Sequence, residues 1–228
     1  MSNTINKSRE LDNKITELEK VLYRLKCFLD IHKIIGLNYK KINAMGWGKL
    51  FFWEVQDVTL QSYVLGIHKV FEKEKSYELN SLPFILKTAK DCKPKDEQAL
   101  KDFVSKYIDL LSHREGRCSN SQIAEIEEIY AKFYQKYFIE DDRLKKVRNK
   151  IIAHSEDIED VKRPKDLPSY DVMEKLLHFA IDIHSAISNG YLEVCPHPIK
   201  SDERAFSSTC AVLEKLGVSN VKTKFDDE

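Results

Sequence analysis

Apolar residues recur every three or four positions along most of the chain, and this spacing predicts a protein built from helices. Strand-like alternation is nearly absent, and only seven glycines and six prolines interrupt the 228 residues. The first predicted helix covers residues 9–35, where a stripe of leucine and isoleucine ends at Gly36. A second helix over residues 49–74 is apolar on more than one face, so we expect it at the centre of a bundle.

Two further helices are predicted near the middle of the chain. Asp96 is the expected cap of a helix that runs to His113, and Asn120 is the expected N-cap of the next helix, over residues 121–138. Isoleucine and aromatic residues recur in that helix at intervals of three and four. This spacing is typical of a core stripe rather than of a surface that stacks bases.

The rest of the chain predicts two helices and then a change of character. A helix over residues 142–153 begins with acids at its positive end, and a charged linker with prolines separates it from a helix over residues 170–188. The predicted helix ends at an Asn-Gly pair. The chain then continues with a turn-rich stretch, a short helix and a polar tail that we expect to be mobile. The sequence therefore predicts an all-α fold: an up-and-down helical bundle over residues 1–190, with a small helical C-terminal appendage over residues 191–228.

Composition narrows the range of partners. Lysine plus arginine equals aspartate plus glutamate at 37 each, so the surface offers no long-range positive field, and any contact with RNA must be local. No apolar run reaches about eighteen residues and the N-terminus is polar, which argues against membrane insertion or export. The five cysteines are scattered and odd in number, as suits free thiols. We expect a cytoplasmic protein.

The stretch "RNKIIAHSE", residues 148–156, carries side chains that suit phosphodiester chemistry. His154 titrates near neutrality and fits general acid or base work, while Arg148 offers planar, bidentate donors to phosphate. Asn149 could orient either the histidine or the ribose. A local basic cluster that would gather phosphates consists of Arg143, Lys145, Lys146 and Lys150, although acids follow directly after the motif. The plainer interpretation is a histidine at the negative end of a helix and an arginine in a surface salt bridge.

Helical geometry sets a condition on this candidate site. Leu144, Val147 and Ile151 form one narrow stripe that should face a core or a partner. Arg148 and His154 lie on opposite flanks of the stripe, about 120° apart, so a single straight helix does not aim both groups at one phosphate. Either the helix ends or unwinds before His154, or the stripe packs against the same helix of a second subunit and each site takes groups from both chains.

The motif resembles that of a known family. Arg148 and Asn149, four intervening residues and His154 resemble the R-x(4–6)-H signature of the HEPN superfamily, and "LKKVRNKIIAHSE" resembles its AbiU-type abortive-infection branch. That branch carries an "R-[ND]-K-x-x-A-H" string on a late helix, after an aromatic-rich second helix and a segment comparable to "SLPFILK". The resemblance covers roughly Leu11 to Ser188. It implies a homodimeric bundle, whose active members cleave RNA without a metal to leave a cyclic phosphate end.

The resemblance also implies a biological setting and roles for residues. It predicts a metal-independent endoribonuclease, without cofactor, that serves phage defence or a toxin-antitoxin pair with an antitoxin protein as partner. Its catalytic residues would be Arg148, Asn149 and His154. The target would be single-stranded RNA, because a regular duplex resists the in-line position that the sugar hydroxyl must reach. The alternative is a catalytically silent HEPN-type interaction or scaffold protein.

Other chemistries find little support in the sequence. Cys195 and His197 stand in a proline-bound turn without a second close pair, so a zinc site is not expected. His178 and His184 lie six residues apart on one predicted helix and read as half-buried bundle residues. The chain contains no glycine-rich phosphate loop, G-x-S-x-G elbow or Rossmann fingerprint.

Overall fold

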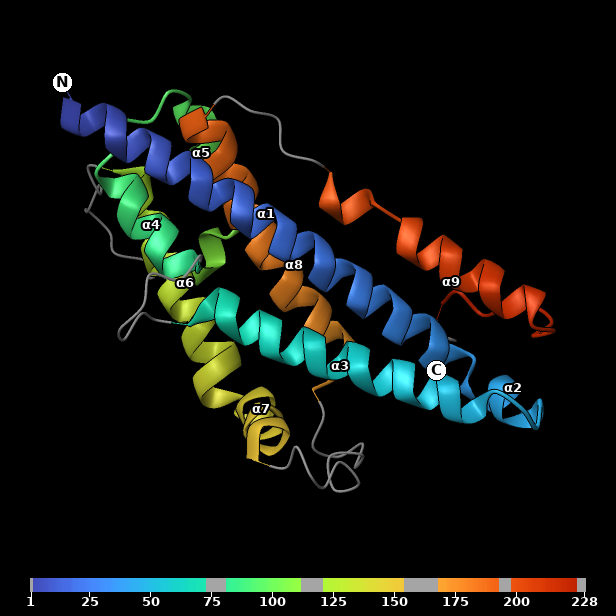
Figure 1. Ribbon diagram of the computed structural model, residues 1–228. Helices are drawn as coiled ribbons and strands as arrows, with labels where there is room; N and C mark the ends of the chain where they lie inside the picture. Colours follow the sequence, from blue (N-terminus) through green and yellow to red (C-terminus); the bar gives the residue numbers. More distant parts are fainter. Residues whose placement is uncertain (1, 73–80, 112–120, 154–167, 193–197, 225–228) are drawn as a thin grey trace.

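The computed structural model describes residues 2–72, 81–111, 121–153, 168–192 and 198–224 (Figure 1). Within these ranges every regular element is a helix and no strand occurs. The predicted all-α fold is therefore confirmed. None of the helices in this part of the chain combines the length and the apolar composition that crossing a membrane would need.

The α-helices are α1 (Ser2–Leu37), α2 (Tyr39–Ala44), α3 (Lys49–Phe71), α4 (Leu82–Lys90), α5 (Glu97–Lys106), α6 (Gln122–Tyr134), α7 (Arg143–Ala153), α8 (Tyr170–Ile187) and α9 (Arg204–Lys215). Shorter turns of 3₁₀-helix are η1 (Ile108–Leu110) and η6 (Ile199–Ser201), and π-helical segments are η2 (Gln135–Glu140) and η5 (Ser188–Leu192).

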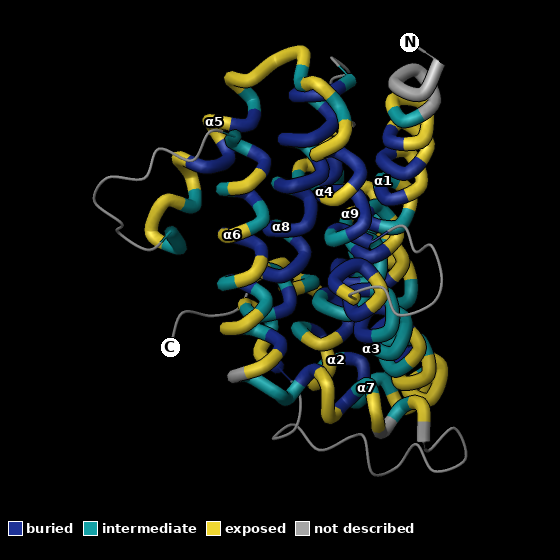
Figure 2. The backbone as a smooth tube through the Cα atoms, turned by 90° about the vertical axis from the view of Figure 1, so that its left-hand side faces the viewer, coloured by how far each residue is buried: buried dark blue, intermediate teal, exposed yellow. Residues whose placement is uncertain are grey.

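Helix α8 occupies the centre of the bundle. Helices α1, α3, α4 and α5 all contact it, and its backbone is buried over much of its length in Figure 2. The expectation that residues 49–74 would form the central helix is wrong. Helix α3 buries Tyr63, Val64 and Ile67 on one side, but it leaves Phe51 and Val58 exposed on the other. Its second apolar face is surface rather than core.

A cluster of aromatic rings joins the C-terminal end of α3 to α6, η2 and α8. The ring of Phe71 lies 4.7 Å from that of Phe138 and 6.2 Å from that of Phe179, between ring centroids. Phe133 stacks on Phe179, with centroids 3.6 Å apart. The Tyr130 hydroxyl donates a hydrogen bond of 2.8 Å to the Phe71 carbonyl. These contacts confirm that the aromatic stripe of α6 belongs to the core.

Helix α9 packs along α1, beside a second, smaller core (Figure 1). This core contains Ile34, Ile35, Ile42, Phe52, Leu213 and Val218. Residues after α9 are also tied to the bundle, because the side chain of Asn38 donates to the Lys222 carbonyl at 2.9 Å and accepts from the Lys222 amide at 2.8 Å. The Lys41 ammonium also donates to the carbonyls of Ser219 and Asn220, so the expectation of a mobile tail does not hold for residues 219–222.

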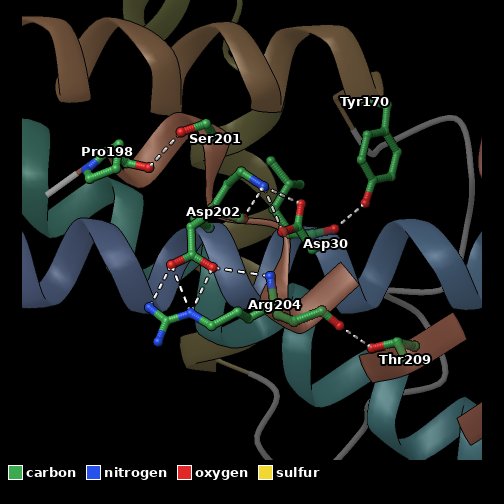
Figure 3. Close-up of polar contacts among 10 residues, drawn as sticks. Asp30, Tyr170, Pro198, Ser201, Asp202, Arg204 and Thr209 are labelled. Carbon is green, nitrogen blue, oxygen red and sulfur yellow. Dashed lines mark hydrogen bonds and ion pairs between the residues drawn. The ribbon is translucent and has the colours of Figure 1, made fainter. Parts of the chain in front are cut away.

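The start of α8 is anchored on α1. The Tyr170 hydroxyl donates to the Leu29 carbonyl at 2.6 Å, next to an ion pair of 2.6 Å between Lys26 and Asp30 (Figure 3). The same lysine reaches the carbonyl of Asp202 at 3.4 Å, and the Asp202 carboxylate pairs with Arg204 at the start of α9. Helices α1, α8 and α9 thus meet at one polar junction.

Helix boundaries differ from the predictions in α1, α5 and α6, and α1 begins at Ser2 rather than at residue 9. Asp96 does cap α5, since its carboxylate accepts from the Gln98 amide at 2.8 Å, but the helix ends at Lys106 rather than at His113. At Tyr107 the backbone leaves the helical region, and this ring packs against Phe103 with a centroid distance of 4.8 Å. The N-cap of α6 is Ser121 instead of Asn120, and the last turns of the predicted helix over 121–138 become the π-helical η2.

Candidate active site

Helix α7 packs against α3 through the stripe that the sequence singles out. Leu144 and Val147 are 2% and 1% exposed, and the half-buried Ile151 packs against the same core. The sequence left open whether this stripe faces a core or a partner. In the structure it faces a core, and this core belongs to the same chain. The stripe is therefore not free to pack against the same helix of a second subunit.

Two cations of the predicted basic cluster are engaged at the start of α7. The Arg143 guanidinium donates to the Asp141 carboxylate at 2.8 and 2.7 Å, and these hydrogen bonds lower the pKa of Asp141. Lys146 pairs with Asp142 at 2.9 Å. The acids at the positive end of the helix, expected from the sequence, thus neutralise Arg143 and Lys146 in part.

Arg148 and Asn149 form a polar pair on the outer side of α7. The guanidinium donates to the Asn149 side-chain carbonyl from Nη2 at 3.0 Å and from Nε at 3.3 Å. Arg148 is half-buried and Asn149 is exposed. The asparagine therefore steadies the arginine, whereas the sequence suggested that it would orient the histidine or the ribose. A guanidinium held through one edge keeps further N–H donors for an anion.

The structure describes only some of the remaining predicted site residues. Lys145 is exposed on α7, three positions before Arg148. Lys150 belongs to the helix, but its side chain lies outside the described residues, and so does all of His154. The distance between Arg148 and His154 therefore stays a prediction, as does the unwinding of the helix before His154.

Sequence reasoning missed His68, a histidine of α3 that lies against α7. It is only 8% exposed, and its ring meets Phe138 edge-on with centroids 5.4 Å apart. Burial lowers the pKa of His68 to about 4; the Leu144 backbone opposes this shift, and the charges of Arg148 and Lys145 add to it. A neutral imidazole therefore lies beneath the predicted cationic site.

The position of His68 could not be read from its local sequence. It stands between Ile67 and Phe71 on a helix with buried residues at most neighbouring positions, where a histidine is usually a core residue. Its Nε2 atom has no hydrogen-bond partner among the described residues. Of the two histidines that the sequence singled out as half-buried, His178 is half-buried as expected, whereas His184 is fully buried, with Nε2 3.2 Å from the Ile15 carbonyl.

Metal ligation has no support within the described residues. No group of three or more histidine, cysteine, aspartate or glutamate side chains gathers there in a way that would hold a metal ion. Cys195 and His197 lie outside this part of the chain.

The comparison with known families decides what kind of protein presents this helix. The profile of the HEPN family AbiU2 matches residues 8–198, which include α7 and its motif. The chain belongs to the AbiU2 family of HEPN domains. No curated protein and no solved structure matches it. The resemblance inferred from the motif is therefore confirmed.

Membership in the AbiU2 family places the motif in the expected context. The matched range extends beyond the predicted Leu11 to Ser188 by three residues at the N-terminal end and by ten at the C-terminal end. It contains α1 from residue 8 onward and all of α2 to α8, while α9 lies beyond it. The AbiU2 region is thus the bundle, and the α9 segment is an addition that packs on α1.

The buried state of His68 predicts how stability depends on pH. Its pKa is about 4 in the folded protein against 6.5 as the ordinary value, so the unfolded chain binds the proton first as the pH falls. Between about pH 7.5 and pH 4.5 this difference should remove about 2.5 kcal/mol from the free energy of unfolding. Urea unfolding at both values should show His68→Gln losing less stability than the wild type by about that amount. An equal loss in the two proteins would contradict the assignment.

Proposed function

We propose that this AbiU2 protein is a metal-independent endoribonuclease that cleaves single-stranded RNA, in phage defence or as part of a toxin-antitoxin pair. HEPN domains are often linked to abortive infection and to RNase activity. The observation that carries the proposal is the Arg148 and Asn149 pair, which holds a guanidinium on the outer side of α7 just before His154.

Each of the three residues has a role that its chemistry supports. The 2′-hydroxyl of the ribose attacks the neighbouring phosphorus, and the bond from phosphorus to the 5′-oxygen breaks, which leaves a cyclic phosphate. His154 moves a proton in this exchange. Arg148 stabilises the negative charge on the phosphorus oxygens, and Asn149 keeps the guanidinium in place.

The charges around the site favour weak binding of RNA. Lys145 and Lys150 flank the arginine along α7, whereas Arg143 and Lys146 already have carboxylate partners. The chain as a whole carries no net charge. RNA binding should therefore depend on a few local contacts. Its affinity should fall only moderately as the salt concentration rises, because few phosphates are neutralised.

We also propose that two copies of the chain associate and that each site takes groups from both. Because Leu144 and Val147 are buried within one chain, the contact must use another surface. The outer side of α3 is a suitable one: Leu50, Phe51 and Val58 are 68%, 63% and 57% exposed and lie within about 100° of one another around the helix. An apolar strip of this kind is typical of an interface, and a two-fold contact through it would cover both copies.

Cleavage is tested with purified protein and single-stranded RNA in the presence of a chelator. Arg148→Ala should lower the rate at least about 100-fold, since it removes a charged donor to the transition state. His154→Ala should lower it by about 100-fold or more. Arg9→Ala, which removes an exposed arginine on α1, is the matched control and should cleave at the wild-type rate.

Two outcomes would reject the enzyme. If the wild type leaves RNA intact under conditions that include any required activator, the protein is the silent interaction module. If Arg148→Ala and His154→Ala both cleave at the wild-type rate while remaining folded, the activity belongs to a contaminant or to another site.

Association of two chains is tested by sedimentation and by mixing. Phe51→Glu should convert a dimer into a monomer, because it places a charge in the apolar contact, whereas Val212→Glu on the exposed side of α9 should leave the dimer intact. Mixing Arg148→Ala with His154→Ala chains should restore about a quarter of the wild-type rate, since half of the dimers then hold one complete site. Heterodimers without any recovered cleavage would exclude a site shared between chains.

A further inference from the structure

A cavity of about 380 Å³ opens between the end of α5, the junction of α6 with η2, and α8. Lys106 and Tyr107 line it from α5 and the turn after it, Lys136 and Tyr137 from η2, and Lys200 from η6. Its volume lies within the range of about 300–1,000 Å³ that is usual for small-molecule sites. Two of its lining residues, Lys136 and Tyr137, come from a π-helical segment, a feature that is frequent at functional sites.

Positive charge dominates the lining. Four lysines face the cavity, Lys106, Lys136, Lys175 and Lys200, against two aspartates, Asp109 and Asp182. Four positive and two negative charges leave the cavity with a net charge of about two positive units. The whole chain is neutral, so this is a local concentration of charge.

Asp182 shows how the cations are held together. Its carboxylate accepts from the Lys106 ammonium at 2.7 Å and from the Tyr107 hydroxyl at 2.7 Å, and it also pairs with Lys200. Burial acts to raise the pKa of Asp182, but the hydrogen bonds from Lys106, Lys200 and Tyr107 outweigh it and lower that pKa. One carboxylate thus fixes two ammonium groups close together, and a positive charge is left over.

The other two lysines of the lining differ from this pair in that no carboxylate of the described residues holds them. Lys136 on η2 and Lys175 on α8 have no carboxylate partner within the described part of the chain, and both are exposed. Long, flexible side chains of this kind can turn toward an anion at the mouth of the cavity. The cavity therefore combines two fixed cations with two adaptable ones.

The remaining wall is aromatic. Tyr137 packs on Phe133 with centroids 4.6 Å apart, and His178 is half-buried beside them. Burial, followed by the charge of Lys200, lowers the pKa of His178, so its ring is neutral at cellular pH and can share a hydrogen bond with a hydroxyl. Such a wall suits the organic part of a polar ligand.

We propose that this cavity binds a phosphomonoester, with the phosphate over the lysines and its organic group against Tyr137 and His178. A phosphomonoester carries about 1.5 to 2 negative charges at pH 7, which matches the net charge of the lining. A phosphodiester carries only one. Arg148 does not line the cavity, so the proposal stands independently of RNA cleavage.

Calorimetric titration of the full chain tests the proposal with ribose 5-phosphate as the probe and ribose as its unphosphorylated control. Ribose 5-phosphate should bind and ribose should not. Changing Lys136→Ala and Lys175→Ala together should weaken binding at least about tenfold, because two charged contacts are lost. Lys132→Ala, one turn earlier on α6 and outside the cavity, removes one lysine charge close by and should bind as the wild type does.

A second variant moves the affinity in the opposite direction. Asp109→Asn removes a negative charge from the lining and should tighten binding about threefold. The proposal is wrong if ribose 5-phosphate does not bind, if ribose binds as tightly, or if the affinity is unchanged in both the double lysine variant and Asp109→Asn.

The source of the phosphate is distinguished with three further probes. Inorganic phosphate reports the anion contact alone, and a short DNA strand with a 5′-phosphate is compared with the same strand bearing a 5′-hydroxyl. DNA lacks the 2′-hydroxyl and is not cleaved, so the result does not depend on the RNase site. Binding of the phosphorylated strand in preference to ribose 5-phosphate assigns the cavity to nucleic-acid ends, and the reverse order assigns it to a small metabolite.

Discussion

The ring of Phe71 at the C-terminal end of α3 lies against Phe138, and this contact determines where α7 can begin. Phe138 belongs to the π-helical η2, directly before the turn that leads into α7, and its ring also meets His68 one turn back on α3. Once these rings are in place, Leu144 and Val147 can reach the same core, and Arg148 is left on the outer side. Burial of aromatic surface, rather than any polar contact, therefore places the predicted RNase motif.

The same packing explains the electrostatics of the site. Burial is the main cause that opposes the protonation of His68, and the nearby charges of Arg148 and Lys145 oppose it further. A neutral ring there leaves the cations of α7 without an added positive charge beneath them. The carboxylates that compensate charge lie at the start of the helix, where Asp141 and Asp142 meet Arg143 and Lys146. Arg148, in contrast, is steadied by a neutral amide and keeps its full charge for an anion.

Much of this arrangement follows from local patterns in the sequence, and the rest depends on contacts between distant segments. Periodic apolar residues locate α1, α3, α7 and α8 to within a few residues, except for the longer N-terminal end of α1, because each helix must bury one stripe. The pairing of Arg148 with Asn149 could also be anticipated, because the two residues are adjacent in the sequence. The role of His68 was not, since it arises from a contact across more than seventy positions with the backbone of Leu144. The π-helical segment around Lys136 could not be predicted from its local sequence either. The residues there favour an α-helix, and the tertiary packing of Phe138 overrides this local preference.

The most direct test weakens the contact between Phe138 and α3 and follows α7 and cleavage together. Phe138→Leu, compared with Phe103→Leu in α5 as an equally buried control, is examined by amide hydrogen exchange and by RNA cleavage. The account predicts faster exchange in residues 143–153 of Phe138→Leu, unchanged protection in α1 and α8, and a parallel loss of cleavage, with none of these changes in α7 of Phe103→Leu. Wild-type cleavage by a Phe138→Leu protein whose α7 has lost its protection would contradict it.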